Sequence, residues 1–515
     1  MTLEKRLLNA SMGGFASFVV SLVQSVALVP LLLVFWGIGT YGVWLSLSAL
    51  FAVIISADSG YQYYMGNELC RGFSIRHVEP DEFKRALASG FRMATLLGIF
   101  EISVTLCITG FGFLPMVLGV TKEVVLRQEL TLVVLVMVVG WIFTGPFGGI
   151  LNGVYLSTGL LSRSIWIGVI TRTINVIILG GCVLLGYSFL TLVSLMSIVG
   201  VISLCFMVLD LRKRFPDHLT FWQGSTWGIA LKNFKRSMVF TFSFMLTQLQ
   251  GSGLLIRITT LLSPSAVPAF TTTRTLGNTF IQCNSIIMNP LAPEMIRYNF
   301  TNEYKKLINT WVVLWWGIGG ITNVLLLISL FFIEPLYTIW THGKLPFQMP
   351  LYLLIAWLVS VQICSLPLMT YLNATNNLRA VLLIASIQTF TVLGVATLLL
   401  KPIGLLGAGV ALIMGELLGP IWLCRYFTRK QLNAIGGKFP IMLDVLSLVG
   451  CSIVGLVFIV VNYELVSLTL AGSLGIAALT LLYVIEWFLL PIELQERVSE
   501  FISMRGLTLS ITKQG

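Results

Sequence analysis

Charged residues are scarce in this chain. They make up 10% of its 515 residues, while 57% are hydrophobic. A water-soluble protein of this size has about 25% charged residues. The charges also cluster and leave apolar runs of 18 or more residues between them, long enough to cross a bilayer as helices. The alternating segments that build outer-membrane barrels are missing. The composition therefore predicts an all-α, polytopic membrane protein.

Residues for metal, redox or nucleotide chemistry are also few. None of the eight cysteines falls in a predicted outer loop or forms a CxxC pair. We therefore expect them to be small core residues rather than disulfides or metal ligands. No Gly-rich nucleotide-binding loop occurs, so the chain is not expected to hydrolyse ATP by itself. We expect no metal and no cofactor.

Hydropathy places fourteen predicted spans in the chain. They cover residues 13–35, 42–65, 93–117, 129–152, 164–186, 189–209, 238–262, 267–290, 311–333, 350–371, 380–400, 404–423, 442–461 and 468–490. Of the 32 Lys and Arg residues, 25 lie in segments on the side of the N-terminus and four on the other side. Because cytoplasmic loops carry the excess of Lys and Arg, both termini are predicted to be cytoplasmic. The net charge of +11 then mostly reflects the Lys and Arg residues of the predicted cytoplasmic loops, and nucleic acid is not an expected partner.

The two halves of the chain resemble each other at an offset of 221 residues. Glu82–Arg85 and Glu303–Lys306 both read Glu-aromatic-basic-basic, and 146–152 and 367–373 both begin with Pro and end with Leu-Asn. Each copy holds six predicted helices, an even number, so the copies share one orientation and form a parallel repeat. The predicted organisation is an N-terminal six-helix lobe at 1–211, a cytoplasmic linker at 212–236, a C-terminal six-helix lobe at 237–430, and two additional helices with a cytoplasmic tail at 431–515.

One stretch, 263–294, is unusually polar for a membrane helix. It contains three threonines beginning at Thr271, followed by Arg274 and Asn278. A charge at the bilayer centre costs at least about 2.5 kcal/mol, so such a residue normally faces protein or water. We interpret this stretch as the lining of a polar cavity, with Arg274 as its main charge. The preceding span adds a second intramembrane cation, Arg257.

Arg257 and Arg274 are predicted to lie at comparable depth, about five residues before and about ten residues after the outer turn at 263–264. The planar guanidinium of Arg binds phosphate through two parallel hydrogen bonds, so we expect the two residues to bind an anionic group. The alternative is that they reach the outer headgroups or pair with a carboxylate. Thr271 has two open roles: its hydroxyl could bind glycan hydroxyls or its own helix backbone.

Three acidic residues inside predicted spans are candidates for ion coupling. Asp58 could titrate, form a salt bridge that opens during transport, or be a helix-breaking Asp hydrogen-bonded beside Gly60. Glu101 shares its depth and lobe with Arg172, and we interpret these two residues as a buried ion pair. Glu416 has no equally obvious partner and could be a proton site.

Short motifs give the chain a family resemblance. The first outer turn reads Trp36-Gly-x-x-x-Tyr41-Gly-x-Trp44, and the second span carries Asp58-x-Gly60. Together with the two six-helix lobes, these features resemble the polysaccharide exporters of the multidrug/oligosaccharidyl-lipid/polysaccharide (MOP) superfamily, and within it the Wzx-type flippases of lipid-linked O-antigen units. The resemblance implies a V-shaped cleft between the lobes, lined chiefly by spans one, two, seven and eight. The residues implied there are Gln24, Asp58, Gln248, Gln250, Arg257 and Arg274.

The two additional helices resemble those of the lipid II flippase branch of this superfamily, where such a pair forms a groove for the lipid tail. The chain departs from that branch because its first two spans hold no evident cluster of cations. We therefore expect a polysaccharide repeat unit rather than lipid II as the substrate.

The leading hypothesis is a flippase that moves an undecaprenyl-pyrophosphate-linked oligosaccharide across the bacterial cytoplasmic membrane by alternating access. Its expected partners are the lipid-linked glycan, membrane lipids and other polysaccharide-assembly proteins. The first alternative is a cation-coupled multidrug exporter of the same fold, for which carboxylates and aromatic residues would dominate the cleft. The second is a polysaccharide polymerase or ligase, which needs a sizeable outer loop. The longest predicted outer loop, 334–349, is short, although it contains His342, so we do not expect an enzyme.

Overall fold

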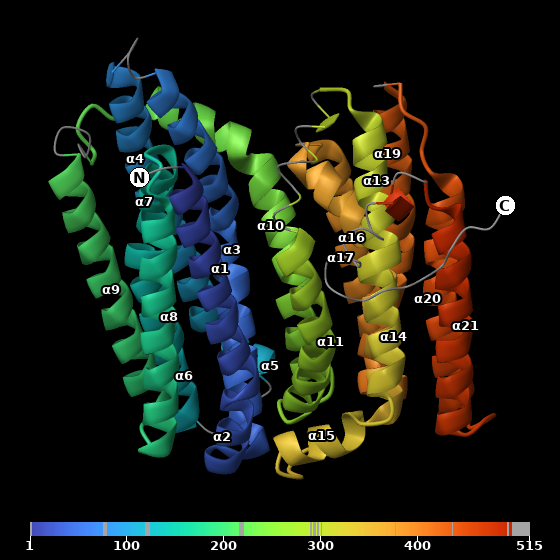
Figure 1. Cartoon of the computed structure of the whole chain (residues 1–515). Coiled ribbons are helices and arrows are strands. Elements are labelled where there is room, and N and C mark those ends of the chain that lie inside the picture. The colour runs from blue at the N-terminus through green and yellow to red at the C-terminus, as the bar shows by residue number, and fades with distance from the viewer. Residues whose placement is uncertain are drawn as a thin grey trace. The chain divides into compact units, whose positions relative to one another are not determined.

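The computed structural model describes residues 3–75, 80–118, 124–215, 221–288, 291, 295, 298–299, 301–375, 377–434, 436–491 and 494–496. All regular structure in these residues is helical (Figure 1). The helices are α1 (Leu3–Val26), α2 (Leu28–Phe35), α3 (Gly37–Ile75), α4 (Pro80–Gly110), α5 (Phe113–Leu118), α6 (Val124–Thr144), α7 (Pro146–Ser157), α8 (Leu161–Leu184), α9 (Phe189–Arg214), α10 (Trp227–Leu261), α11 (Ala266–Met288), α13 (Tyr304–Val313), α14 (Gly320–Ser329), α15 (Ile333–Trp340), α16 (Met349–Ala374), α17 (Leu378–Ile403), α18 (Leu405–Glu416), α19 (Trp422–Ala434), α20 (Ile441–Asn462) and α21 (Leu468–Leu489). Two π-helical turns, η2 (Leu314–Gly319) and η3 (Leu417–Ile421), join α13 to α14 and α18 to α19.

Thirteen helical stretches among the described residues are long and apolar enough to cross a membrane. They coincide with thirteen of the fourteen predicted spans, which confirms the prediction of an all-α polytopic membrane protein. The remaining predicted span, 267–290, coincides with α11, whose polar side chains lower its hydropathy. The cytoplasmic placement of both termini stays a prediction.

Local sequence explains several helix ends. Gly37 adopts a φ of 73° in the turn between α2 and α3, a conformation that glycine reaches without steric cost. The hydroxyl of Ser188 accepts a hydrogen bond from the backbone N–H of Thr191 and caps α9. Pro146 occupies the first turn of α7, where its missing N–H leaves no intrahelical bond unmade. The fourth predicted span, 129–152, is therefore divided at this point into α6 and α7.

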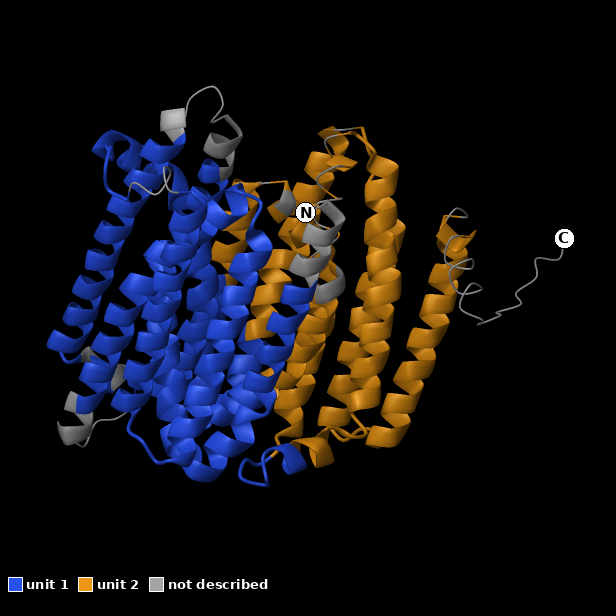
Figure 2. Cartoon of the chain, turned by 60° about the vertical axis from the view of Figure 1, so that its left-hand side comes forward, with its two compact units in different colours: residues 1–272, 338–346, 389–411 blue, residues 273–337, 347–388, 412–515 orange. Residues whose placement is uncertain are grey.

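Backbone contacts divide the chain into two compact units (Figure 2). Unit 1 comprises residues 1–272, 338–346 and 389–411, and unit 2 comprises 273–337, 347–388 and 412–515. Unit 1 thus contains α10, which the predicted repeat places at the start of the second lobe. The division into two six-helix lobes with a linker at 212–236 stays a prediction.

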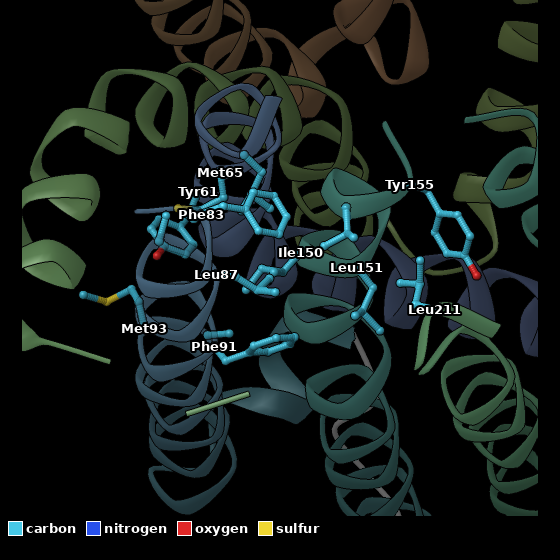
Figure 3. Close-up of a cluster of buried hydrophobic side chains, with 14 of the residues drawn as sticks. Tyr61, Met65, Phe83, Leu87, Phe91, Met93, Ile150, Leu151, Tyr155 and Leu211 are labelled. Atoms are coloured by element: carbon cyan, nitrogen blue, oxygen red, sulfur yellow. The ribbon is translucent and has the colours of Figure 1, made fainter. Parts of the chain in front are cut away.

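A cluster of buried side chains joins α3, α4, α7, α9 and α10 in unit 1 (Figure 3). It includes Tyr61, Met65, Phe91, Ile150 and Leu211. Lipid tails are as apolar as these side chains, so in a bilayer the helices associate through close van der Waals packing rather than through the hydrophobic effect. This cluster fixes α3, the helix that carries Asp58, against its neighbours.

The helices α3 and α10 approach each other at backbone distance. A Cβ added at Gly60 would lie 2.1 Å from the backbone nitrogen of Thr241 in α10. The hydroxyls of Ser46 and Thr259 hydrogen-bond across the same pair of helices. Small residues allow such close helix approach in membranes. Because α3 runs without interruption through Gly60, the interpretation of Asp58 as a helix-breaking residue is wrong.

In unit 2 the two additional helices are part of the main packing. The cluster that includes Leu326, Tyr352, Val454 and Leu479 joins α14, α16, α20 and α21. A buried ion pair ties α19 to α20, because the Nε–H of Arg425 donates to both carboxylate oxygens of Asp444 at 2.9 Å. Such a pair holds its partners in one geometry, since separating two buried charges is costly.

Candidate functional site

Asp58 lies in the interior of unit 1, where its side chain is fully buried. The indole N–H of Trp141 in α6 donates a hydrogen bond to Oδ2 of Asp58 at 3.2 Å. The other oxygen, Oδ1, has no hydrogen-bond partner. An unpartnered buried carboxylate oxygen costs free energy, so this oxygen is available to a proton, a cation or a moving side chain.

Trp141 owes its position to the break between α6 and α7. A Cβ added at Gly145 would lie 2.1 Å from Cε2 of the indole, so the ring packs onto the bare backbone of the break. Phe51 of α3 packs edge-on against the indole, with ring centroids 6.1 Å apart. The break, the glycine and the aromatic neighbour together direct the indole N–H toward Asp58.

Glu101 of α4 is a second buried acidic residue of unit 1. Its side chain is 1% exposed, and neither carboxylate oxygen has a hydrogen-bond partner. A buried carboxylate without a hydrogen-bond partner is costly, so Glu101, like Asp58, suits the binding of a proton or a cation.

The predicted ion pair between Glu101 and Arg172 is wrong. The Nη1 of Arg172 donates instead to the hydroxyls of Ser17 at 3.2 Å and Ser21 at 2.7 Å, both in α1. A count of residues along each helix predicts a depth but leaves the direction of the side chain open. Arg172 contacts α1, and neither carboxylate oxygen of Glu101 accepts a hydrogen bond from another residue.

Gln24 and the polar residues of α10 also belong to unit 1. Gln24 lines a cavity of about 610 Å³ together with Arg172. Gln248 is half-buried and donates to the hydroxyl of Ser252 in its own helix. Gln250 is half-buried and Arg257 is exposed. Arg257 forms no ion pair with the residues that the structure describes. Their joint role in one cleft stays a prediction.

The helix α11 carries one polar face. Thr271, Arg274, Asn278 and Gln282 fall within about 80° of one another around a helix of 3.6 residues per turn. All four are half-buried. The hydroxyl of Thr271 donates a hydrogen bond to the carbonyl of Val267 in its own helix. This contact is one of the two roles expected for Thr271 from the sequence. Among the described residues, no carboxylate lies within ion-pair distance of Arg274.

The opposite face of α11 packs on the core of unit 2. A Cβ added at Gly277 would lie 2.6 Å from Cγ2 of Ile355 in α16, and Phe280 packs against the same core. The hydroxyl of Thr322 donates to Oδ1 of Asn284 at 3.1 Å. The core therefore fixes the rotation of α11, and the face with Arg274 and Asn278 is directed away from it.

Glu416 is buried in unit 2 and, unlike Glu101, is well supplied with donors. Ser365 donates to one carboxylate oxygen at 2.7 Å, and Gln388 donates to the other at 2.8 Å. A third contact, from Gln362, is 3.5 Å long. These partners come from α16 and α17. The role of Glu416 as an ion-coupling candidate stays a prediction.

Sequence reasoning missed Trp141, although one signal was available. Trp is usually enriched at the two membrane interfaces, whereas Trp141 falls near the centre of the predicted span 129–152. A tryptophan at mid-membrane depth needs a partner for its N–H, because no water is available there. The search for that acceptor would have led to a buried carboxylate such as Asp58.

Solved structures resemble this arrangement of helices. An inward-facing multidrug resistance MATE family transporter of the MOP superfamily matches with a TM-score of 0.62 and 13% identity, over 85% of this chain and 96% of that chain. The chain has the MOP-superfamily fold. The Vibrio cholerae MATE transporter VcmN in its bent form matches with a TM-score of 0.55 and 14% identity, over 84% of this chain and 97% of its own. No model of a known protein family and no curated protein matches the sequence.

The lipid II flippase MurJ, in an inward closed conformation, matches with a TM-score of 0.61 and 12% identity. The match covers 96% of this chain and 99% of MurJ. Only about 21 residues of this chain lie outside it. Most of 431–515 is therefore inside the match, so the likeness to MurJ extends into the appended segment that contains α20 and α21.

Proposed function

We propose that this chain is a flippase that moves an undecaprenyl-pyrophosphate-linked oligosaccharide across the bacterial cytoplasmic membrane. The observation that carries the proposal is Arg274, a cation in the middle of α11 with no carboxylate partner among the described residues. A lone charge at membrane depth is costly. A chain retains it where a ligand or water compensates the charge, and the planar guanidinium matches the oxygens of a phosphate.

The neighbours of Arg274 suit the rest of such a substrate. Asn278 lies one turn further along the same face and has an amide that can both donate to and accept from a sugar hydroxyl. The likeness to a lipid II flippase over 96% of this chain favours a lipid-linked substrate. We propose further that the repeats at 1–211 and 237–430 act as the two lobes of an alternating-access transporter, with both termini in the cytoplasm.

Replacement of Arg274 tests this function. In bacteria that depend on this chain for surface polysaccharide, Arg274→Ala is expected to abolish the polysaccharide while the protein stays in the membrane. Arg274→Lys is expected to restore it only in part, because an ammonium group keeps the charge but not the two-pronged hydrogen bond. Arg379→Ala, at the exposed start of α17, removes the same charge elsewhere and is expected to export normally. Normal export by Arg274→Ala would refute the proposal.

Asp58 and Glu101 support an ion-coupled mechanism and keep a second function open. Their buried oxygens without partners suit the binding and release of a proton or cation. A multidrug exporter of this fold would also need buried carboxylates that bind and release a proton or cation, but its substrate would not be an anion. If drug resistance depended on Asp58 and Glu101 while Arg274 variants had no phenotype, the exporter would replace the flippase as the proposed function.

A further inference from the structure

Unit 1 contains a cavity that plays no part in the proposed function, which rests on Arg274 of α11. It has a volume of about 610 Å³, within the range of about 300–1,000 Å³ typical of small-molecule sites. The walls come from α1, α3, α6, α7, α8 and α9. Among the described residues that line it, Arg172 is the one charged side chain, and none is Asp or Glu. The one charge among these lining residues is therefore positive, and an exposed side chain carries it.

Arg172 is held in place without being neutralised. Its Nη1 donates to the hydroxyls of Ser17 and Ser21, which anchor the side chain to α1. Arg172 forms no ion pair with the described carboxylates. A guanidinium carries five N–H groups, so hydrogen bonds at one nitrogen leave donors on the others. An anion that enters the cavity would meet an oriented cation.

The rest of the lining offers hydrogen-bonding groups beside flat apolar surface. Asn152 and Asn175 supply amides, and the buried Oδ1 of Asn175 has no hydrogen-bond partner. The hydroxyls of Thr171 and Ser203 bond each other at 2.9 Å at the wall. Trp44 and Phe51 contribute aromatic surface from α3. Amides and hydroxyls fit the hydroxyl groups of a sugar, and the aromatic rings fit its C–H faces.

We propose that this cavity binds a polyol phosphate, with the phosphate on Arg172 and the hydroxyl groups on Asn152, Asn175 and their neighbours. Two sources share this chemistry: a sugar phosphate and the glycerophosphate head group of a membrane phospholipid. The site lies wholly within unit 1 and does not include Arg274, so it stands whether or not α11 binds a lipid-linked glycan.

Direct binding to the purified full-length chain tests the proposal. Equilibrium dialysis in a neutral detergent uses radiolabelled glucose 1-phosphate as the probe, with unlabelled glucose and inorganic phosphate as competitors. Saturable binding is expected at the wild-type chain, and both competitors should be weaker than unlabelled glucose 1-phosphate because each offers only part of the chemistry. Arg172→Gln is expected to weaken binding by about tenfold or more, since it removes charge-assisted hydrogen bonds. Arg172→Lys should retain part of the affinity.

Arg163→Gln is the matched control. Arg163 lies on the same helix, α8, but forms an ion pair with Asp210 at 3.0 Å and does not line the cavity. Binding by this variant should equal that of the wild type. To guard against misfolding, the variants are compared only as monodisperse protein. Equal binding by Arg172→Gln and the wild type, or the absence of saturable binding at the wild type, would overturn the proposal.

Lipid nanodiscs separate the two sources. If the phospholipid is the occupant, discs of phosphatidylglycerol should abolish probe binding at the wild type, while discs of phosphatidylcholine should not. If a sugar phosphate is the occupant, binding should be equal in both lipids. Either result supports the anion site at Arg172, provided that Arg172→Gln remains defective in phosphatidylcholine discs. Normal binding by that variant there would contradict it.

Discussion

Replacement of Gly60 by alanine tests the contact between α3 and α10. The new Cβ would lie 2.1 Å from the nitrogen and 2.3 Å from the Cα of Thr241. Ordinary van der Waals contact begins near 3.4 Å, so the two helices must separate by about 1.3 Å at this point. Overpacking of this kind costs about 1–3 kcal/mol. We expect the upper part of that range, because backbone atoms cannot rotate away as a side chain can.

The measurement is the apparent melting temperature of the purified chain in detergent, read as the monodisperse fraction after heating. Gly60→Ala is expected to melt several degrees below the wild type. Gly251→Ala in α10 is the control, because a Cβ there meets nothing within 4 Å, and it should melt at or slightly above the wild-type temperature. Truncation of Thr241 to glycine should not rescue Gly60→Ala, since the contacted atoms are main-chain atoms. Wild-type melting of Gly60→Ala would refute the close approach.

Two further predictions concern the buried carboxylates. In proteoliposomes, Asp58→Asn and Glu101→Gln are expected to abolish gradient-driven transport while keeping substrate exchange in the absence of a gradient; loss of both activities together would point to a structural role instead. Glu416→Gln places an amide N–H₂ group next to the donors Ser365 and Gln388. This variant should lower the free energy of unfolding by about 1–3 kcal/mol. The measurement is its melting temperature, compared with that of Glu464→Gln, a control at an exposed residue that follows α20. An unchanged melting temperature for Glu416→Gln would show that the donors rearrange freely.

The number and positions of the helices could be predicted from the sequence because hydropathy is a local property. Each apolar run had to become a helix to satisfy its backbone hydrogen bonds in lipid, and thirteen of the fourteen predicted spans are helices that meet the criteria of length and hydropathy. The polar character of α11 was equally visible, since Arg274 and Asn278 are one turn apart. Such features depend only on residues that are near each other in the chain.

Side-chain pairing could not be predicted in the same way. Arg172 and Glu101 were expected to pair, yet Arg172 donates to Ser17 and Ser21 of α1, and the carboxylate of Glu101 has no hydrogen-bond partner. The donors to Glu416 come from residues 28 and 51 positions away in the chain. A periodic pattern identifies the buried face of a helix, but the neighbour on that face depends on how all the helices pack.

The π-helical turn η3 directly follows Glu416 and contains Pro420. A turn of this kind accommodates one residue more than an ordinary helical turn. A chain shortened by one position within Leu417–Ile421 could therefore close the bulge into regular helix and leave the downstream side chains of α19 on their original faces. Elsewhere in a long helix the same deletion would rotate everything after it by about 100°. Within the long helices, η3 and the similar turn η2 should therefore tolerate the loss of a residue better than the regular helix on either side of them.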